Sequence, residues 1–137
     1  MTSLRVSRGE LGDNVAIMGL GLVGNMAGQL FTAAGMDVIG IDLIDERLRI
    51  AERCGIKHTI NPKKEDLEER IREFTDGEGC EVTVEAIGNP STVMACCRIT
   101  KRLGEVILLG SPRGTYKADV TKILNYVHLW PRDCLTL

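Results

Sequence analysis

The sequence predicts an α/β fold: a doubly wound parallel sheet of six strands, in the order 3-2-1-4-5-6, with helices on both faces. Two observations lead to this prediction. Short apolar runs alternate along the chain with amphipathic stretches of helical periodicity, and such alternation is typical of a parallel sheet with crossover helices. Most of the helical stretches are followed by a glycine, which readily adopts the left-handed conformation that ends helices.

The first strand is predicted at residues 14–18, and the helix after it at residues 22–34, where Gly35 ends it. The second strand follows at residues 36–41. Residues 14–36 carry no charge, so a membrane-spanning helix is a formal alternative. Five glycines make this stretch a poor spanning helix, whereas a buried strand and its helix explain it.

The second helix is predicted to begin at Asp45 as its N-cap, to carry Leu48 and Ala51 on one face and to end at Gly55. A short third strand follows at residues 57–60.

Asn61 and Pro62 predict the start of the third helix, because an asparagine cap followed by proline in the first turn is a common helix beginning. The apolar positions of that helix fall at i, i+4 and i+7 on one face, at Leu67, Ile71 and Phe74.

Residues 76–79, Asp-Gly-Glu-Gly, break the third helix, and the fourth strand is predicted at residues 81–87. A fourth helix is expected at residues 90–102 with Gly104 as its stop, and the fifth strand at residues 105–109.

A polar loop at residues 111–114 leads to residues 119–129, which present an apolar helix face. Residues 134–137 begin a further strand, which we expect to be the sixth. Because the sequence stops at the start of that strand, we expect this chain to be part of a longer protein.

The 137 residues suffice for a single domain, residues 1–137, that buries about two-thirds of the surface of its unfolded chain. Basic residues number 17 and acidic residues 19, so the formal charge is only -2. No field of a single sign exists to hold nucleic acid or an anionic membrane. We therefore expect a small-molecule partner, with no nucleic acid and no membrane.

The cysteines are odd in number and include no C-x-x-C pair, which argues against a disulfide framework and against a zinc knuckle. They are Cys54, Cys80, Cys96, Cys97 and Cys134. The amino-terminal residues, where Arg5, Arg8 and Glu10 lead into an apolar run, do not form a signal peptide. We expect reduced thiols and a cytoplasmic location.

The glycine-rich turn after the first strand has the spacing G-x-G-x-x-G at Gly19, Gly21 and Gly24, and Asp42 closes the second strand 21 residues after Gly21. This arrangement is the fingerprint of a dinucleotide-binding Rossmann fold. Gly19 allows the sharp turn, Gly21 removes a β-carbon where pyrophosphate touches the backbone, and Gly24 lets the helix lie close to the sheet. The helix N-terminus offers N–H groups to the phosphates. Asp42 would bind the ribose hydroxyls and repel the extra phosphate of NADP, which favours NAD.

Further motifs follow in order along nearly the whole chain. They are residues 12–15 (Gly-Asp-Asn-Val), residues 38–42 (Val-Ile-Gly-Ile-Asp), residues 60–62 (Ile-Asn-Pro), residues 84–89 (Val-Glu-Ala-Ile-Gly-Asn) and residues 103–110 (Leu-Gly-Glu-Val-Ile-Leu-Leu-Gly). With these motifs the chain resembles the coenzyme-binding domain of the medium-chain, zinc-containing alcohol dehydrogenase superfamily. The resemblance implies an oxidoreductase that transfers hydride between an alcohol or polyol and the nicotinamide.

The resemblance also implies a set of cofactor-binding residues. These are Gly19, Gly21, Leu22, Val23, Gly24, Asp42, Leu43, Arg47, Ala86, Ile87, Gly88, Leu109, Gly110 and Ser111. It places Val23 behind the nicotinamide and Arg47 beside the adenosine ribose. Residues 86–88 match a loop over the adenosine side, and residues 109–111 match a loop near the nicotinamide. In this family the dimer joins two coenzyme domains edge to edge, so a homodimer through the C-terminal edge of the sheet is expected.

One departure from the family concerns the metal. Its catalytic zinc, the Cys and His ligands and the substrate pocket belong to a separate domain, mostly upstream of the glycine turn. Only 18 residues precede Gly19, and they contain neither Cys nor His. We expect this chain to hold no metal and no catalytic residue, and to bind the cofactor without turnover.

Alternative interpretations of several residues, and of the function, also fit the sequence. Asp42 could be an exposed acid near a helix start and Arg47 a solvated surface residue. His58 and His128 fit structural or surface positions better than metal ligation, and Glu85 receives no chemical role. A non-enzymatic, nucleotide-sensing module of a transport system uses a similar motif. An S-adenosylmethionine methyltransferase usually carries an acid where this chain has Met18.

Overall fold

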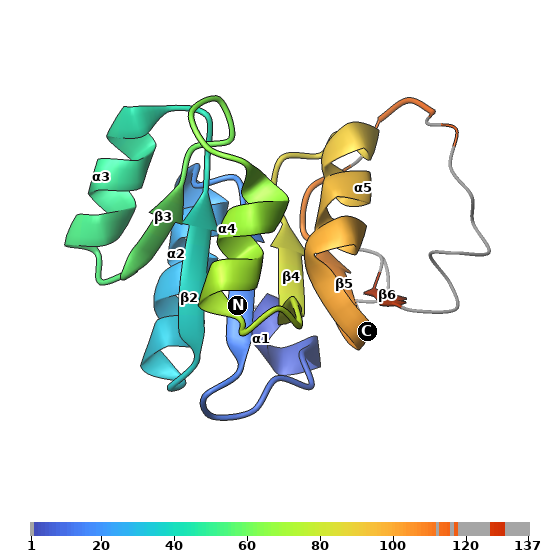
Figure 1. Ribbon diagram of the computed structural model, residues 1–137, viewed down its shortest axis with the longest axis horizontal. Coiled ribbons are helices and arrows are strands. Elements are labelled where there is room, and N and C mark those ends of the chain that lie inside the picture. Colours follow the sequence, from blue (N-terminus) through green and yellow to red (C-terminus); the bar gives the residue numbers. More distant parts are fainter. Residues whose placement is uncertain (1, 112, 116, 118–126, 131–137) are drawn as a thin grey trace.

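The computed structural model describes residues 2–111, 113–115, 117 and 127–130 (Figure 1). Its elements, in chain order, are α1 (Thr2–Val6), β1 (Asn14–Met18), α2 (Leu22–Ala33), β2 (Asp37–Ile41), α3 (Asp45–Arg53), β3 (His58–Ile60), α4 (Leu67–Phe74), β4 (Cys80–Glu85), α5 (Pro90–Ile99), β5 (Thr100–Leu108) and β6 (Val127–Trp130). The first strand lies where the sequence predicts it, and the short helix α1 was not predicted.

The strands form one sheet in the order β3-β2-β1-β4-β5-β6, and each neighbouring pair is parallel. The predicted order of the first five strands is confirmed. In the centre, Ile17 of β1 lies opposite Gly40 of β2 and Val84 of β4. The chain order reverses between β1 and β4, and in a doubly wound sheet the crevice at that point is where ligands bind.

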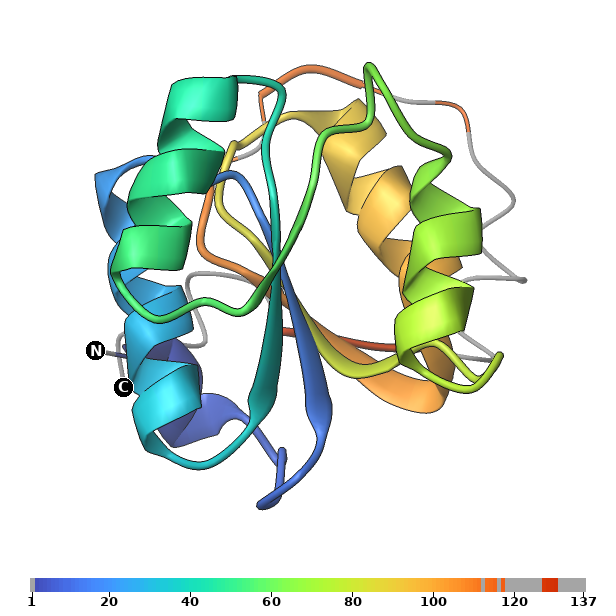
Figure 2. The same ribbon diagram turned by 60° about the vertical axis from the view of Figure 1, so that its left-hand side comes forward.

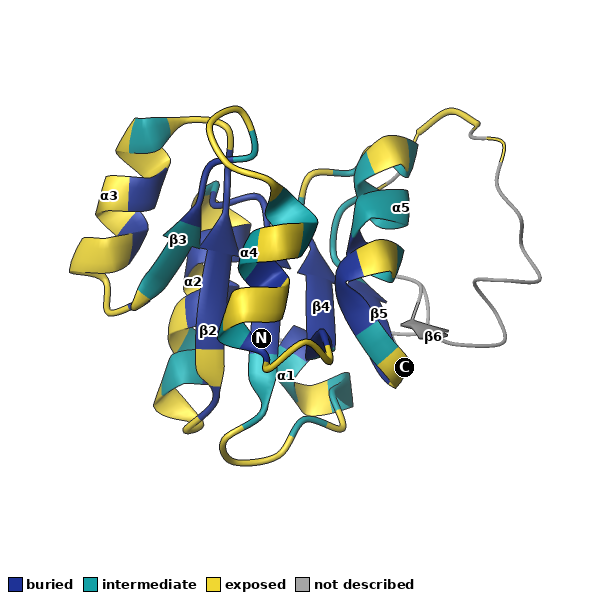
Figure 3. Ribbon diagram, in the orientation of Figure 1, coloured by how far each residue is buried: buried dark blue, intermediate teal, exposed yellow. Residues whose placement is uncertain are grey.

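Helices cover both faces of the sheet, as predicted (Figure 2). Successive residues of β1 contribute to opposite faces. Ile17 packs in one apolar cluster with Phe31 of α2 and Leu48 of α3, whereas Ala16 packs in another with Ile71 of α4. Figure 3 shows the consequence: the central strands are buried, and each helix exposes its outer side.

Two predicted helix beginnings are wrong. Asp45 is the first residue of α3 rather than its cap, and the N-cap is Ile44. The N-cap of α4 is Asp66, whose carboxylate accepts a bond from the N–H of Glu69 at 2.8 Å. Asn61 instead stabilises a turn by accepting from the N–H of Lys63, while its amide donates to Asp45 at 2.7 Å. The side chain of Asn61 therefore connects two loops and does not cap a helix.

The boundary between α5 and β5 also differs from the prediction. The helix ends at Ile99 rather than near residue 102, and Gly104 lies inside β5 instead of ending the helix. Thr100 explains the early change, because its hydroxyl lies 2.7 Å from the carbonyl oxygen of Cys96 and 2.8 Å from the hydroxyl of Thr83 on β4. A side chain that bonds the last helical turn and the neighbouring strand draws the backbone into the sheet.

The sixth strand comes from a different segment than predicted. Residues 127–129, assigned by the sequence to a helix, belong to β6, where Leu129 lies opposite Val106 of β5. β-Branched and aromatic residues at 127 and 130 favour a strand. The remainder of the predicted helix, residues 119–126, and the strand predicted at residues 134–137 lie outside the described residues.

The uncharged stretch at residues 14–36 is divided between β1 and α2. Within the described part of the chain, no helix has the length and hydropathy needed to cross a membrane.

Candidate functional site

The turn between β1 and α2, residues 19–21, begins at a glycine that the backbone requires. Gly19 has φ +96°, a conformation that L side chains rarely adopt. Its N–H donates to the carbonyl of Ile41 at 2.8 Å, which ties the start of the turn to the end of β2. A β-carbon here would also stand 2.6 Å from the side chain of Ile87.

Gly24 is required for a different reason, because close packing leaves no room for a side chain at this position. A β-carbon at this position would overlap the carbonyl oxygen of Gly19 and lie 3.3 Å from the β-carbon of Ala86. The absence of that carbon lets the first turn of α2 lie directly against the loop and the end of the sheet, as the sequence predicts.

Gly21 is not required by the protein itself. Its φ of −64° and ψ of −172° are open to any residue, and apart from its two chain neighbours no residue comes within 4 Å of the position of a β-carbon. It is the N-cap of α2, and no side chain caps that helix. The first N–H groups of a helix have no partner within the helix, and its dipole is positive at this end. An open space that meets uncapped N–H groups suits an anion.

Asp42 lies at the end of β2 and is buried, so the reading of it as an exposed acid is wrong. One carboxylate oxygen accepts from the N–H of Leu20 at 2.8 Å, and the other accepts from the N–H of Ile44 at 2.9 Å. Arg47 reaches the first of these oxygens at 3.4 Å. A carboxylate has about four acceptor positions, so Asp42 can still accept bonds from a ligand.

A largely apolar cleft of about 560 Å³ opens at this end of the sheet. Four residues predicted for the site line it: Asp42, Leu43, Arg47 and Ile87. Other residues of the cleft were not predicted for the site: Met18, Ile41, Ile44, Pro62, Lys63, Leu67, Ser91, Thr92 and Ala95. They end or follow the first three strands, or belong to α4 and α5. Their position near the carboxyl ends of strands is a signal that could have indicated some of them.

The remaining predicted residues lie beside the cleft in two loops. The loop at residues 86–88 follows β4, and the N–H of Ala86 donates to the carbonyl of Met18 at 2.9 Å. The loop at residues 109–111 follows β5. A β-carbon on Gly88 would stand 3.0 Å from the backbone nitrogen of Ser111, so the two loops touch. Gly19 and Gly21 lie in the turn before α2, and Gly24 is buried in the first helical turn. Leu22 and Val23 are exposed on the same helix.

Charges at the rim of the cleft are mixed. The side chain of Arg47 is 48% exposed and faces the buried carboxylate of Asp42. Lys63, in the loop after β3, is exposed and also lines the cleft. Nearby, hydrogen bonds from Lys64 and from Asn61 hold the pKa of Asp45 below its usual value. The cleft therefore presents two cations and one carboxylate.

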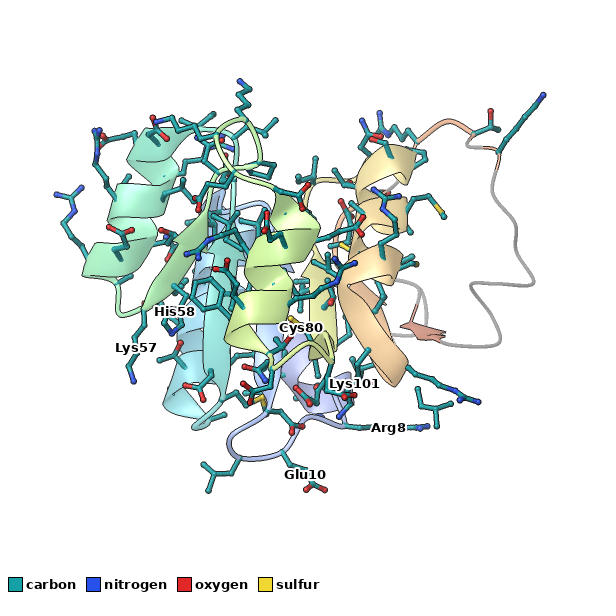
Figure 4. All side chains as sticks on the ribbon, in the orientation of Figure 1. Arg8, Glu10, Lys57, His58, Cys80 and Lys101 are labelled. Atoms are coloured by element: carbon teal, nitrogen blue, oxygen red, sulfur yellow. The ribbon has the colours of Figure 1, made fainter. Side chains whose placement is uncertain are left out.

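The described cysteines and His58 fit structural roles. Cys80 and Cys96 are buried, and burial raises the pKa of the Cys80 thiol to about 12. Figure 4 shows Cys80 between the layers and His58 on the outer strand. The ring of His58 stacks on Phe74 with the ring centres 4.5 Å apart. Among the described residues, no group of His, Cys, Asp and Glu is arranged to hold a metal ion.

Residues 23–129 match the family model of the zinc-binding dehydrogenases. This chain belongs to that family. A zinc-type alcohol dehydrogenase-like protein of Haemophilus influenzae is 34% identical over 102 residues, which cover 74% of this chain and 30% of the relative. The sorbitol dehydrogenase of Bacillus subtilis is 30% identical over 133 residues, covering 88% of this chain and 38% of that enzyme.

The crystal structure of 2R,3R-butanediol dehydrogenase from Bacillus subtilis contains a domain of the same fold as this chain. Its TM-score is 0.87 at 25% identity, and the match covers 95% of this chain and 38% of the enzyme. The chain thus matches only 30% to 38% of the length of these relatives.

Because Gly24 is packed against backbone and Gly21 faces open space, replacing each by alanine should lower the free energy of unfolding by different amounts. Gly24→Ala should lower the free energy of unfolding by at least about 2 kcal/mol, because a backbone oxygen occupies the space of the new carbon. Gly21→Ala should lower it by less than about 1 kcal/mol. Urea unfolding of the two variants measures both values. Equal losses would contradict the assignment of open space to Gly21.

Proposed function

We propose that this chain binds NAD(H), as the coenzyme domain of an alcohol or polyol dehydrogenase. The carrying observation is Gly21: the fold gives no reason for a glycine there, whereas a dinucleotide pyrophosphate lying against the backbone does. The relatives named above are dehydrogenases, which favours this function over the transport-regulator alternative. The family normally combines a nicotinamide cofactor with zinc, and we place the zinc and the substrate on a separate domain.

In this proposal different residues of the site contact different parts of the cofactor. The pyrophosphate lies on the N–H groups of α2 in front of Gly21. The carboxylate of Asp42 accepts from the adenosine ribose hydroxyls, and Arg47 covers that carboxylate from the solvent side. The adenine occupies the apolar cleft between Ile44 and Ile87.

The loop at residues 86–88 covers the adenosine side, and the loop at residues 109–111 lies near the nicotinamide, together with Val23 of α2. The bound nicotinamide supplies the hydride acceptor. The contribution of this chain is to hold and orient that ring.

Asp42 also supports the choice of NAD over NADP. Its carboxylate is held by backbone N–H groups on both sides, so it cannot swing away to admit a ribose phosphate. Bringing a phosphate beside a fixed carboxylate costs electrostatic energy, which Arg47 offsets only in part because half of its side chain is in water.

The nearly balanced charge supports a dinucleotide partner over nucleic acid or a membrane, and the described cysteines are free thiols, as suits a cytoplasmic location. A homodimer completes the proposal. β6 is the last strand of the described sheet, and an edge strand can pair with a second copy.

Gly21→Val should keep the fold and abolish binding of NAD⁺, because the side chain fills the space assigned to the pyrophosphate. Calorimetry with NAD⁺ measures the affinity, and circular dichroism verifies the fold. Cys54→Val, a substitution at an exposed residue of α3's carboxyl end, is a control for added bulk. Undiminished binding by folded Gly21→Val would refute the placement of the cofactor.

Asp42→Ala should weaken binding of NAD⁺ by about 1.5 to 3 kcal/mol, the scale of a hydrogen bond to a charged group, and should leave binding of NADP⁺ equal or better. Since Asp42 also holds the turn, the ratio of the two affinities is the informative quantity. Asp45→Ala is the control, because this nearby carboxylate bonds Lys64 and Asn61 and does not line the cleft. Equal affinities of the parent chain for both nucleotides would contradict the proposed selectivity.

Light scattering should show a mass of twice 15.0 kDa at high concentration. His128→Pro and Leu129→Pro form a matched pair, because successive N–H groups of a strand point to opposite sides. One proline removes a donor to β5 and the other a donor at the open edge. The edge variant should remain folded and become monomeric. A monomeric parent chain, or a dimer that survives both substitutions, would exclude this interface.

A further inference from the structure

Glu85 is a buried acid that the proposed cofactor contacts leave unused. It is the last residue of β4, and none of its surface is exposed. Removing a carboxylate from water is costly unless hydrogen bonds replace the lost solvation. The partners that replace it show what this side chain does.

The carboxylate of Glu85 accepts bonds from the loop and the helix that follow it. One oxygen accepts from the N–H of Ile87 at 3.0 Å, from the N–H of Gly88 at 2.9 Å and from the hydroxyl of Thr92 at 2.7 Å. The second oxygen lies 3.1 Å from the N–H of Gly88. Hydrogen bonds to an ionised acceptor are the strong ones, and here they fix a loop that has no regular structure of its own.

The loop after β5 rests on the same residue. The N–H groups of Leu109 and Gly110 both donate to the backbone carbonyl of Glu85 at 2.8 Å. A β-carbon on Gly110 would collide with the carboxylate of Glu85 and with the backbone nitrogen of Gly88. The carboxylate, the loop at residues 86–88 and the loop at residues 109–111 are therefore packed as one unit.

Glu85 does not line the cleft, but two of its hydrogen-bond donors, Ile87 and Thr92, do. Ile87 also lies against the glycine turn, at the place where a β-carbon of Gly19 would be. We infer that Glu85 is a positioning residue for dinucleotide binding: its carboxylate sets the wall of the cleft that Ile87 and Thr92 form and joins it to the loop at residues 109–111. This inference rests on the proposed function.

Glu85→Gln tests the inference, because it keeps the shape but replaces one acceptor oxygen by a donor that faces N–H groups. Glu105→Gln is the matched control. Glu105 is also buried and accepts from a hydroxyl and a backbone N–H, those of Ser7 and Arg8, but it lies toward the other end of the sheet, beside a hollow that Arg8 and Lys101 also line. Figure 4 labels Arg8 and Lys101. Both variants lose stability, and calorimetry with NADH is run where both are folded.

Glu85→Gln should bind NADH about tenfold more weakly than the parent chain, the effect of losing one hydrogen bond to a charged group, while Glu105→Gln stays within about twofold. Amide NMR adds a readout that stability alone does not move. The N–H protons of Ile87 and Gly88 should shift upfield in Glu85→Gln and keep their positions in Glu105→Gln.

Thr92→Val decides the question if Glu85→Gln does not fold, since it removes one donor to the carboxylate with little change of shape. It should weaken NADH binding by about threefold and shift the Gly88 amide. Parent-like affinity in folded Glu85→Gln or in Thr92→Val, or equal losses in Glu85→Gln and Glu105→Gln, would overturn the inference. A parent chain that does not bind NADH would instead remove the proposed function, and this inference with it.

Discussion

The close contact between α2 and the glycine turn is the constraint on which the site depends. Because Gly24 has no side chain, the first turn of α2 lies against the carbonyl of Gly19 and against Ala86. The helix is thereby fixed over β1, where Phe31 completes one apolar cluster. Its N-terminus then ends at the carboxyl edge of the sheet, with Gly21 facing open space. The contact between Gly24 and the carbonyl of Gly19 therefore determines both the packing of α2 in the core and the geometry of the candidate anion site.

Asp42 links this turn to the neighbouring strand. Its carboxylate holds Leu20 in the turn and Ile44 at the start of α3, so β2, the turn and α3 share one buried anchor. A residue proposed to select the cofactor is therefore also part of the framework. Affinity and stability are coupled at such a position, and changes in cofactor preference should require adjustments in the residues that it holds.

The sequence predicted the part of the site that depends on local chain geometry. The strand at residues 14–18, the three glycines and the acid that closes the second strand at position 42 were all recognisable, because each has a conformational or spacing requirement. The burial of that acid came only from the structure. The N-cap of α4 was misplaced because the side chain of Asn61 is held by Asp45, a contact between residues 16 positions apart. Thr100 and the segment at residues 127–130 were misassigned for a similar reason: pairing with β4 and β5 overrides local helical preference. Cleft residues such as Lys63 and Thr92 become neighbours only when three loops meet.

Two buried carboxylates stand at the ends of the strands that flank β1, and they follow one rule. Asp42 accepts from the N–H two residues later in its own chain, and so does Glu85. Each acid thereby converts the irregular segment after a strand into a fixed wall. They differ in what lies on their open side: Asp42 borders the cleft, whereas Glu85 is enclosed by the loops that it holds. Backbone N–H groups oppose both negative charges, so the N-terminus of α2 between them can still favour an anion. This division leaves one acid to contact a ligand and the other to shape the space around it.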